Sequence, residues 1–325
     1  MALYLVTGGA GFIGSHLVEA LLGRGDRVRV LDDLSTGRRA NLEPFAPGSP
    51  GSGAALELYE AELSDRAALD SALVGVRGIF HQAAQVSVPL SVEAPERSLE
   101  VNAMGTLRLL EAARRARVQG LVFAASSAAY GNNPCLPKHE DLPPEPLSPY
   151  AIGKLVGEQL LSVYGQLHGL RTVSLRYFNI FGPRQLDDSP YTGVIAIFAR
   201  RLLLGQAIEI HGDGEQTRDF TFVANAVRAN LLAMEAALAG RVPGGRVYNV
   251  GAGERTSINQ LYRELARLAG VDRPPSYAPS RAGDVRHSFA SLERIQAELG
   301  YRPEVAFAEG LRRTFDWYRA RFQRA

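Results

Sequence analysis

A tyrosine and a lysine stand four residues apart in the segment SPYAIGKLVGE, at Tyr150 and Lys154. Lys154 is one of only two lysines among the 36 lysines and arginines of the chain. If both residues lie on one helix, its 3.6-residue repeat places them on the same face, one turn apart. The charge of an ammonium responds to its surroundings, whereas a guanidinium stays charged. The pair therefore predicts a phenol activated as a general base by a neighbouring cation; an ordinary helix whose lysine reaches solvent is the alternative.

A glycine cluster near the N-terminus predicts a dinucleotide-binding turn. In TGGAGFIGSH the glycines recur at every third position, Gly8, Gly11 and Gly14, after an apolar run and before a helical pattern. They allow a tight turn, close approach of a pyrophosphate and close packing of the helix on a strand. Asp32 ends the next strand-like run, where a carboxylate would bind the adenine ribose hydroxyls and repel a 2′-phosphate. This context predicts NAD rather than NADP, although two arginines that follow argue the other way.

The elements that must position these residues alternate between strand and helix through about residue 180. Strands are expected at LYLVT, RVRVLDD, GIFHQAA, GLVFAASS and TVSLRYFN, and helices after the glycine cluster, around LEVNAMGTLRLLEAARRA and from Pro149 to about His168. Such alternation specifies a parallel sheet with helices on both faces, and its carboxyl edge should hold the site. The segment APGSPGSG is expected to be a solvated loop.

The regular alternation of strands and helices ends after FGPRQ. Helices are expected near GVIAIFARRLLLG and at 257–269, 291–299 and 306–321, and a strand at RVYNVG. We therefore expect an α/β fold, with a Rossmann-type doubly wound parallel sheet in residues 1–180 and a smaller C-terminal α/β substrate domain in residues 181–325. A segment near 215–251 is expected to return to the first domain.

Composition restricts the class of protein. The chain has 325 residues, a formal net charge of +2 and a single cysteine. The interspersed charges argue against nucleic-acid binding, and the lone Cys135 argues against disulfides and cysteine zinc sites. No apolar run reaches the ~18 residues of a membrane span, and the six histidines lack the spacing of metal ligands. We expect a soluble, cytoplasmic protein that needs no metal and no membrane.

Ten ordered motifs along nearly the whole chain resemble those of the extended short-chain dehydrogenase/reductase family, in its nucleotide-sugar epimerase/dehydratase branch. The motifs are TGGAGFIGSH, LDDLSTG, HQAAQVSV, VNAMGTLRLLEAA, SSAAYG, SPYAIGK, RYFNIFGPRQ, IHGDGEQTRDF, YNVG and RAGDVRHS. The resemblance implies bound NAD, a UDP-sugar substrate and a homodimer formed through the helices around 99–117 and 150–168.

The resemblance also implies roles for individual residues. Tyr150 would be the acid/base, Lys154 would bind the nicotinamide ribose and lower the phenol's pKa, and Ser126 would share the hydrogen bond of the substrate hydroxyl. The implied cofactor-binding residues are Gly8, Gly11, Phe12, Ile13, Asp32, Asp33, Glu62, Leu63, Gln82, Ala83, Ala84, Asn102, Tyr150, Lys154 and Tyr177. The implied substrate-binding residues are Ser126, Tyr150, Asn179, Arg218, Arg281, Asp284 and Ser288.

The motif SSAAYG bears on the reaction. Members of the family that eliminate water or carbon dioxide typically have a carboxylate two residues before the tyrosine of this motif, whereas this chain has Ala128. The resemblance therefore implies 4-epimerisation through a transient 4-keto sugar. Ser288, seven positions after Arg281, occupies the place where a bulky aromatic excludes an N-acetyl group, so UDP-glucose/UDP-galactose and UDP-GlcNAc/UDP-GalNAc are the expected substrates.

Three alternatives remain open on the sequence: a UDP-glucuronate 4-epimerase, a 4-keto-sugar reductase and a non-catalytic NAD-sensing protein. The chain also departs from the family pattern at two places. Asn225 replaces the usual aspartate after RDF, and Ala61-Glu62 replaces the usual Gly-Asp on the adenine side.

Overall fold

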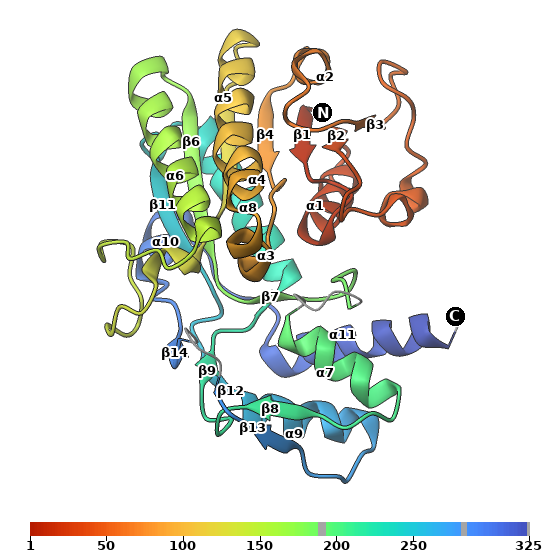
Figure 1. Cartoon of the computed structure of the whole chain (residues 1–325). Coiled ribbons are helices and arrows are strands. Elements are labelled where there is room, and N and C mark those ends of the chain that lie inside the picture. The colour runs from red at the N-terminus through yellow and green to blue at the C-terminus, as the bar shows by residue number, and fades with distance from the viewer. Residues whose placement is uncertain (188–192, 281–284, 324–325) are drawn as a thin grey trace.

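The structure is a computed structural model, and it describes residues 1–187, 193–280 and 285–323. A seven-stranded sheet forms its centre, in the order β11-β6-β5-β4-β1-β2-β3, with every neighbouring pair parallel (Figure 1). The strands, in chain order, are β1 (Leu3–Thr7), β2 (Arg27–Asp32), β3 (Leu56–Glu60), β4 (Gly78–His81), β5 (Gly120–Ser126), β6 (Arg171–Tyr177) and β11 (Arg246–Val250). The predicted Rossmann-type doubly wound sheet is confirmed.

Side chains of successive strand residues enter two different cores, one on each face of the sheet. Val6 packs with residues of α1 (Phe12–Gly23) and α8 (Val223–Leu238), whereas its neighbour Leu5 packs with Leu109 and Leu161 on the opposite face. The helices of that opposite face are α2 (Arg66–Ala72), α3 (Val88–Glu93), α4 (Pro95–Leu99), α5 (Gly105–Arg115) and α6 (Pro149–His168). This two-sided burial explains why β1 and β5, near the centre of the sheet, are largely apolar rather than alternating.

The expected helix in VNAMGTLRLLEAA contains a local irregularity. A π-helical turn, η3 (Glu100–Met104), separates α4 from α5. The irregular turn contains Asn102, which is buried, and π-turns are frequent at functional sites. Apolar spacing alone does not reveal one extra residue in a turn, so the sequence predicted only the helix.

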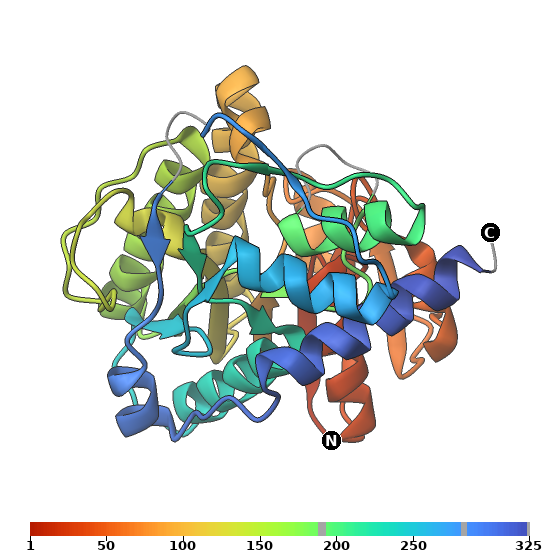
Figure 2. The ribbon, with the colours of Figure 1, turned by 90° about the horizontal axis from the view of Figure 1, so that it is seen from below.

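The smaller unit consists of short strands and three mutually packed helices. Its strand groups are β7 (Ile180–Phe181) with β10 (Thr221–Phe222), β8 (Glu209–His211) with β13 (Ser276–Ala278), and β12 (Thr256–Ser257), β9 (Thr217–Arg218) and β14 (His287–Ser288). Helices α7 (Val194–Leu203), α9 (Ile258–Ala269) and α11 (Phe307–Phe322) share the third core, while α10 (Glu293–Leu299) packs near β11. Figure 2 shows the green α7 beside the blue α9 and α11.

The chain crosses between the two units more than once. Helix α8 and strand β11 follow β7–β10 in the chain but return to the larger unit. Helix α8 packs on the large sheet, and β11 pairs with β6 from Arg246↔Val173 to Val250↔Tyr177. We propose a domain division near residue 180, with residues 223–250 assigned to the larger domain. The carboxyl ends of the parallel strands then face the smaller unit (Figure 1).

Candidate active site

The turn between β1 and α1 is built on glycines. Gly8 has φ +68°, and a Cβ there would lie 2.7 Å from the backbone nitrogen of Ala83. A Cβ on Gly14 would lie 2.1 Å from the carbonyl oxygen of Gly8. Gly11 immediately precedes α1, whose first residues are Phe12 and Ile13, and no side chain among the described residues caps this helix. The first-turn N–H groups of α1 therefore remain available for an anion.

Asp32 holds the loop after β2 against this turn. Its carboxylate is buried and accepts hydrogen bonds from the backbone nitrogens of Ala10 (2.9 Å) and Leu34 (2.9 Å). Burial raises the pKa of Asp32, and the backbone hydrogen bonds oppose that rise. Asp33 is exposed and accepts from the backbone and hydroxyl of Ser35. Binding of adenine ribose by Asp32 and Asp33 remains a prediction.

The expected adenine-side pair lies beyond the end of β3. Glu62 is exposed and forms an ion pair with Arg97 (3.0 Å), which lowers the pKa of Glu62 through a hydrogen bond. Leu63 is buried against Gly105, where a Cβ would lie 2.9 Å from the Leu63 Cδ1 atom. The two neighbours thus have different surroundings: an ion-paired carboxylate at the surface and an apolar side chain beneath it.

A directional hydrogen-bond chain lies beneath the ends of β1 and β4. Thr106 Oγ1 donates to the carbonyl of Asn102 (2.6 Å), so His81 Nε2, 3.0 Å away, must donate to it. His81 Nδ1 then accepts from Thr7 Oγ1 (2.7 Å), which in turn accepts from the backbone nitrogen of Ala83 (3.3 Å). Burial lowers the pKa of His81 to about 3, so the imidazole is neutral and structural.

Asn102 fixes the loop that follows β4. Its side chain accepts from the backbone nitrogen of Gln85 (2.9 Å) and donates to the Gln85 carbonyl (3.0 Å). Helix α6 approaches it closely, because a Cβ on Gly153 would lie 2.9 Å from the Cβ of Asn102. The residue therefore joins the π-turn, the loop carrying Ala84 and the helix carrying Tyr150.

Gln82 and Tyr177 form a hydrogen-bonded group at the sheet edge with a third residue, which the sequence did not single out. Asn230, on α8, donates to the Tyr177 hydroxyl (2.6 Å), and the amide of Gln82 donates to the Asn230 oxygen (3.2 Å). The Tyr177 hydroxyl donates to Gln82 Oε1 (3.3 Å). Burial raises the pKa of Tyr177 to about 12, so it acts as a neutral hydrogen-bonding group.

The residues that start helix α6 determine the turns in which Tyr150 and Lys154 lie. Ser148 caps the helix by accepting from the backbone nitrogen of Ala151 (3.2 Å), and Pro149 starts it, so Tyr150 lies in the first turn and Lys154 in the second. The predicted helix from Pro149 to His168 is confirmed.

The three expected catalytic side chains lie at the end of β5. A hydrogen bond joins the Ser126 hydroxyl and the Tyr150 phenol; burial raises the phenol's pKa, and this hydrogen bond lowers it. Lys154 Nζ donates to the carbonyl of Ala124 (2.8 Å) and lies 4.9 Å from the ring centroid of Phe123. Burial lowers the pKa of Lys154 to about 7. A phenol, a hydroxyl and a titratable ammonium in this arrangement suit proton transfer to and from an alcohol.

The expected substrate residues fall partly within the described residues. Arg218 on β9 pairs in register with Ser288 on β14, so the two lie side by side. Asn179 is exposed beyond the end of β6, and its carbonyl accepts from the backbone nitrogen of Thr221 (3.1 Å). Arg281 and Asp284 lie outside the described residues.

The model of the NAD dependent epimerase/dehydratase family matches residues 4–251. The chain belongs to this NAD-dependent epimerase/dehydratase family. It is 41% identical over 320 residues, 98% of this chain and 99% of the relative, to a UDP-glucose 4-epimerase of Mycolicibacterium smegmatis.

Two solved structures of similar proteins agree over almost the full length. A UDP-N-acetylglucosamine 4-epimerase from Methanobrevibacter ruminantium, solved with UDP-N-acetylmuramic acid, has a TM-score of 0.90 at 37% identity, covering 98% of this chain and 99% of that one. A Thermus thermophilus UDP-glucose 4-epimerase, solved with NAD, has a TM-score of 0.85 at 41% identity over the same shares. The predicted family, enzyme class and NAD dependence are confirmed.

The described residues fit the cofactor of the epimerase/dehydratase family. Side chains at Gly8 and Gly14 would clash with the backbone that forms the turn before α1, and an anionic pyrophosphate suits the free N–H groups at the start of that helix. Lys154 contacts the end of β5, Tyr177 ends β6, and Asn102 fixes the loop after β4. These residues would hold NAD across the sheet.

One departure from the family pattern has a structural explanation. The Asn225 amide donates to the carbonyl of Val305 (2.8 Å), while its oxygen accepts from the backbone nitrogens of Glu304 (2.9 Å) and Val305 (3.0 Å). An ionised aspartate could not donate to that carbonyl. Asn225 therefore secures the chain before α11, away from the proposed chemistry.

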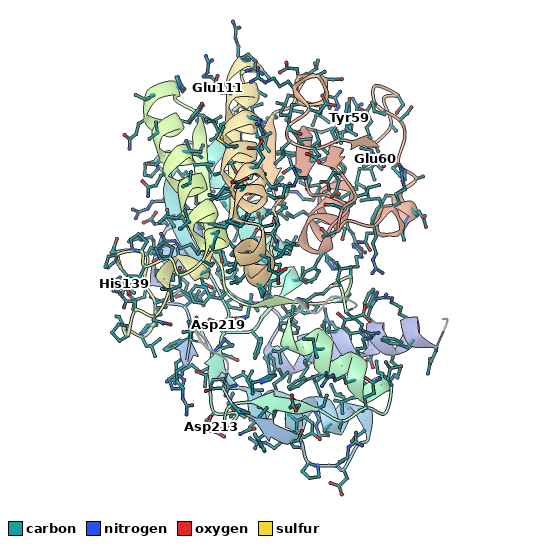
Figure 3. All side chains as sticks on the ribbon, in the orientation of Figure 1. Tyr59, Glu60, Glu111, His139, Asp213 and Asp219 are labelled. Atoms are coloured by element: carbon teal, nitrogen blue, oxygen red, sulfur yellow. The ribbon has the colours of Figure 1, made fainter. Side chains whose placement is uncertain are left out.

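Asp219 is a buried carboxylate that sequence reasoning missed. Its carboxylate accepts from the backbone nitrogens of Ala252 (2.7 Å), Gly253 (3.0 Å) and Ala290 (3.2 Å). Figure 3 shows it where the two units meet. It therefore fixes β9, with Arg218, relative to the chain leading from β14. A carboxylate directly before the mostly apolar run FTFV is the signal that could have identified it.

Two other kinds of site are absent from the described residues. Within residues 1–187, 193–280 and 285–323, no group of three or more His, Cys, Asp and Glu side chains is arranged to hold a metal ion. In the same ranges, no helix has the length and apolarity needed to traverse a bilayer.

Proposed function

We propose that the protein is a UDP-hexose 4-epimerase that interconverts UDP-glucose with UDP-galactose and UDP-GlcNAc with UDP-GalNAc. The observation that carries this proposal is the hydrogen bond between Ser126 and Tyr150, with Lys154 one helical turn further on, beside an η4 turn (Ser127–Tyr130) that contains no carboxylate. Elimination of water from a sugar needs a further acid/base group, and Ala128 supplies none. Removal and return of hydrogen at one alcohol carbon is the reaction that these groups support.

In the proposed reaction each residue has a defined task. Bound NAD supplies the acceptor and later the donor of the C4 hydride. Tyr150 takes the proton of the C4 hydroxyl and returns it when the sugar is reduced on its other face. Ser126 hydrogen-bonds that hydroxyl and orients it, and the Lys154 ammonium stabilises the phenolate.

The proposed sugar range rests on the small side chain beside Arg218. Arg218 suits recognition of a diphosphate, because a guanidinium binds phosphate oxygens in a bidentate manner. The paired position in β14 is Ser288, which is half-buried. A serine leaves room that a bulky aromatic would fill, so we propose that the C2 substituent of the sugar lies on this side.

The test is a substrate panel without added cofactor. UDP-glucose, UDP-GlcNAc and UDP-glucuronate are each incubated with purified protein, and the products are separated by chromatography. We expect the first two to reach equilibrium with their 4-epimers and UDP-glucuronate to remain unchanged. In Ser288→Tyr we expect the N-acetyl activity to fall about tenfold or more while UDP-glucose turnover persists. Conversion of UDP-glucuronate alone, or dependence on added reduced cofactor, would contradict the proposal.

We also propose that the protein is a homodimer through α6. Four apolar side chains on this helix are 37–71% exposed, at helical spacings of four, seven and four residues: Ile152, Val156, Val163 and Leu167. Further exposed apolar side chains lie on the adjacent α3 and η3: Val88, Leu90, Val92 and Met104. A contiguous apolar surface of this kind suits a symmetric interface.

Val163→Lys is expected to convert a dimer into a monomer, because it places a charge in the middle of the proposed interface. Light scattering coupled to size-exclusion chromatography measures the mass. Val74→Lys serves as the control, since Val74 is 66% exposed but lies off this surface. A wild-type monomer at micromolar concentration, or an unaltered mass in Val163→Lys, would contradict the proposed interface.

A further inference from the structure

A buried ion pair lies one turn beyond Lys154. Glu158, on α6, accepts from Arg176 Nε (2.9 Å) and Nη2 (2.7 Å), and the two side chains are only 2% and 5% exposed. The paired, parallel hydrogen bonds fix both groups in orientation. Neither residue is among those expected to touch cofactor or substrate.

Position on the helix brings Glu158 to the face that carries Lys154. The two residues are four apart on α6, so their side chains lie on the same face, and both are buried. Arg176 comes from β6, immediately before Tyr177, and its guanidinium carbon lies 4.7 Å from the ring centroid of Tyr130. Tyr130 ends the η4 turn that starts next to Ser126. The pair therefore contacts the helix, the strand and the turn that carry the proposed catalytic groups.

Glu158 is the charged neighbour that affects the titration of Lys154. The titratable groups that interact with the charge of Lys154 are Glu158 from α6 and His81 from β4, and Tyr150 lies one helical turn before Lys154. His81 is neutral, since burial lowers its pKa to about 3. Among the described residues, the charge acting on Lys154 is thus that of Glu158, which raises the pKa of Lys154 against the larger effect of burial.

Arg176 limits that effect. An unpaired buried carboxylate would attract the ammonium strongly, and an ammonium neutralised by a close anion stabilises a phenolate less. With Arg176 in place, both carboxylate oxygens of Glu158 accept hydrogen bonds from the guanidinium, and Lys154 Nζ donates to the carbonyl of Ala124. Two opposing effects then act on the pKa of Lys154: burial lowers it and the negative charge of Glu158 raises it.

We propose that Glu158 and Arg176 are positioning residues that act through Lys154: Glu158 keeps the buried ammonium charged, and Arg176 restrains Glu158 so that the ammonium serves Tyr150. The catalytic consequence depends on the proposed function, whereas the effect on Lys154 does not. A purely structural ion pair would not affect the pKa of Lys154. In this proposal, removal of Glu158 lowers the pKa of Lys154, and removal of Arg176 raises it.

The low lysine content of the chain makes this titration directly measurable. Full-length protein labelled with ¹³Cε-lysine gives signals from only two lysines, Lys154 and Lys138. Their chemical shifts are followed by NMR from pH 5 to 11 in wild type, Glu158→Gln and Arg176→Gln, with the nicotinamide content equal in all samples. Lys138→Met assigns the signals, and Lys138 serves as the internal reference in the other variants.

We expect the Lys154 midpoint to fall by about one pH unit or more in Glu158→Gln and to rise by a similar amount in Arg176→Gln. Glu57→Gln is the matched control, because Glu57 forms another buried pair, with Arg29 (2.9 Å), on β3 and β2. It should leave the Lys154 midpoint unchanged. Midpoints that move in the same direction in both variants, or do not move, would overturn the proposal.

Turnover supplies the second readout. Glu158→Gln should lower kcat without raising KM for the sugar nucleotide, and Glu158→Asp, which keeps the charge, should restore most of the lost kcat.

If a single variant fails to fold, the double variant Glu158→Gln/Arg176→Gln decides, since a neutral pair avoids an isolated buried charge. Its Lys154 midpoint should lie below that of wild type, because the charge of Glu158 raises the pKa of Lys154 in the wild-type protein; an unchanged midpoint would refute the inference. A normal midpoint pattern with no epimerisation of any sugar would instead reject the proposed function alone.

Discussion

Replacing Tyr150 with phenylalanine is expected to lower kcat by roughly 10²- to 10⁴-fold, because the substitution removes the proposed proton acceptor and leaves the ring in place. The fold should persist, since the phenol makes its hydrogen bond with Ser126 at the edge of the sheet rather than in a core. Initial rates of UDP-sugar epimerisation measure the loss. The KM for the sugar should change little, because the lost interaction acts in the transition state.

The control for this prediction lies on the same helix. Tyr164, also on α6, hydrogen-bonds Glu111 on α5 rather than any proposed catalytic group. Tyr164→Phe should therefore keep the wild-type kcat, and both variants should retain bound nicotinamide. Turnover at the wild-type rate in Tyr150→Phe would reject the assigned base, whereas loss of nicotinamide from that variant would assign the effect to cofactor binding.

Local signals in the sequence are sufficient to place the helix that carries Tyr150 and Lys154. Ser148 and Pro149 form a start signal, and Gly169 adopts the left-handed conformation that ends the helix. Alternation of apolar strands with helices predicted the parallel sheet, and the glycine spacing predicted the turn in which Gly14 cannot carry a side chain. Each of these features is determined by residues close together in the chain, so a single sequence contains the information.

The supporting hydrogen bonds could not be predicted in this way. Arg176 meets Glu158 from another element, and Asp219 binds backbone groups more than 30 residues further along the chain. Such contacts depend on how strands and helices pack, and no local pattern distinguishes a buried arginine partner from a solvated one. The role of Asp32 shows the same limit: its position at a strand end was clear, but its two backbone partners were not.

A tyrosine can act as a base at neutral pH only if its phenolate is stabilised, and Lys154 is the residue proposed to stabilise it. An ordinary phenol has a pKa of about 10 and is protonated at neutral pH. Burial raises the pKa of Tyr150 further, and the Ser126 hydrogen bond opposes this rise. A neighbouring cation must therefore favour the phenolate. In the proposed reaction Lys154 provides one from a buried position, where it contacts the Ala124 carbonyl and the Phe123 ring.

Lys154→Met is accordingly expected to lower kcat at pH 7 by about 10²-fold or more and to move the acidic limb of the rate profile to higher pH. The sign follows from the charge: loss of the cation raises the pKa of Tyr150, so a smaller fraction is phenolate at any given pH. Methionine has a similar length and carries no charge into the buried site, which favours retention of the fold. Steady-state rates between pH 5.5 and 10 measure the shift.

The second lysine of the chain is the control for that experiment. Lys138 is also buried, and burial lowers its pKa, but it lies in the segment between η4 and α6 and donates to the carbonyl of Asn133. Lys138→Met should leave the rate profile of the enzyme in place, because no proposed catalytic group contacts that ammonium. A wild-type profile in Lys154→Met, or an equal shift in both variants, would show that the phenol is ionised by some other means than the neighbouring ammonium.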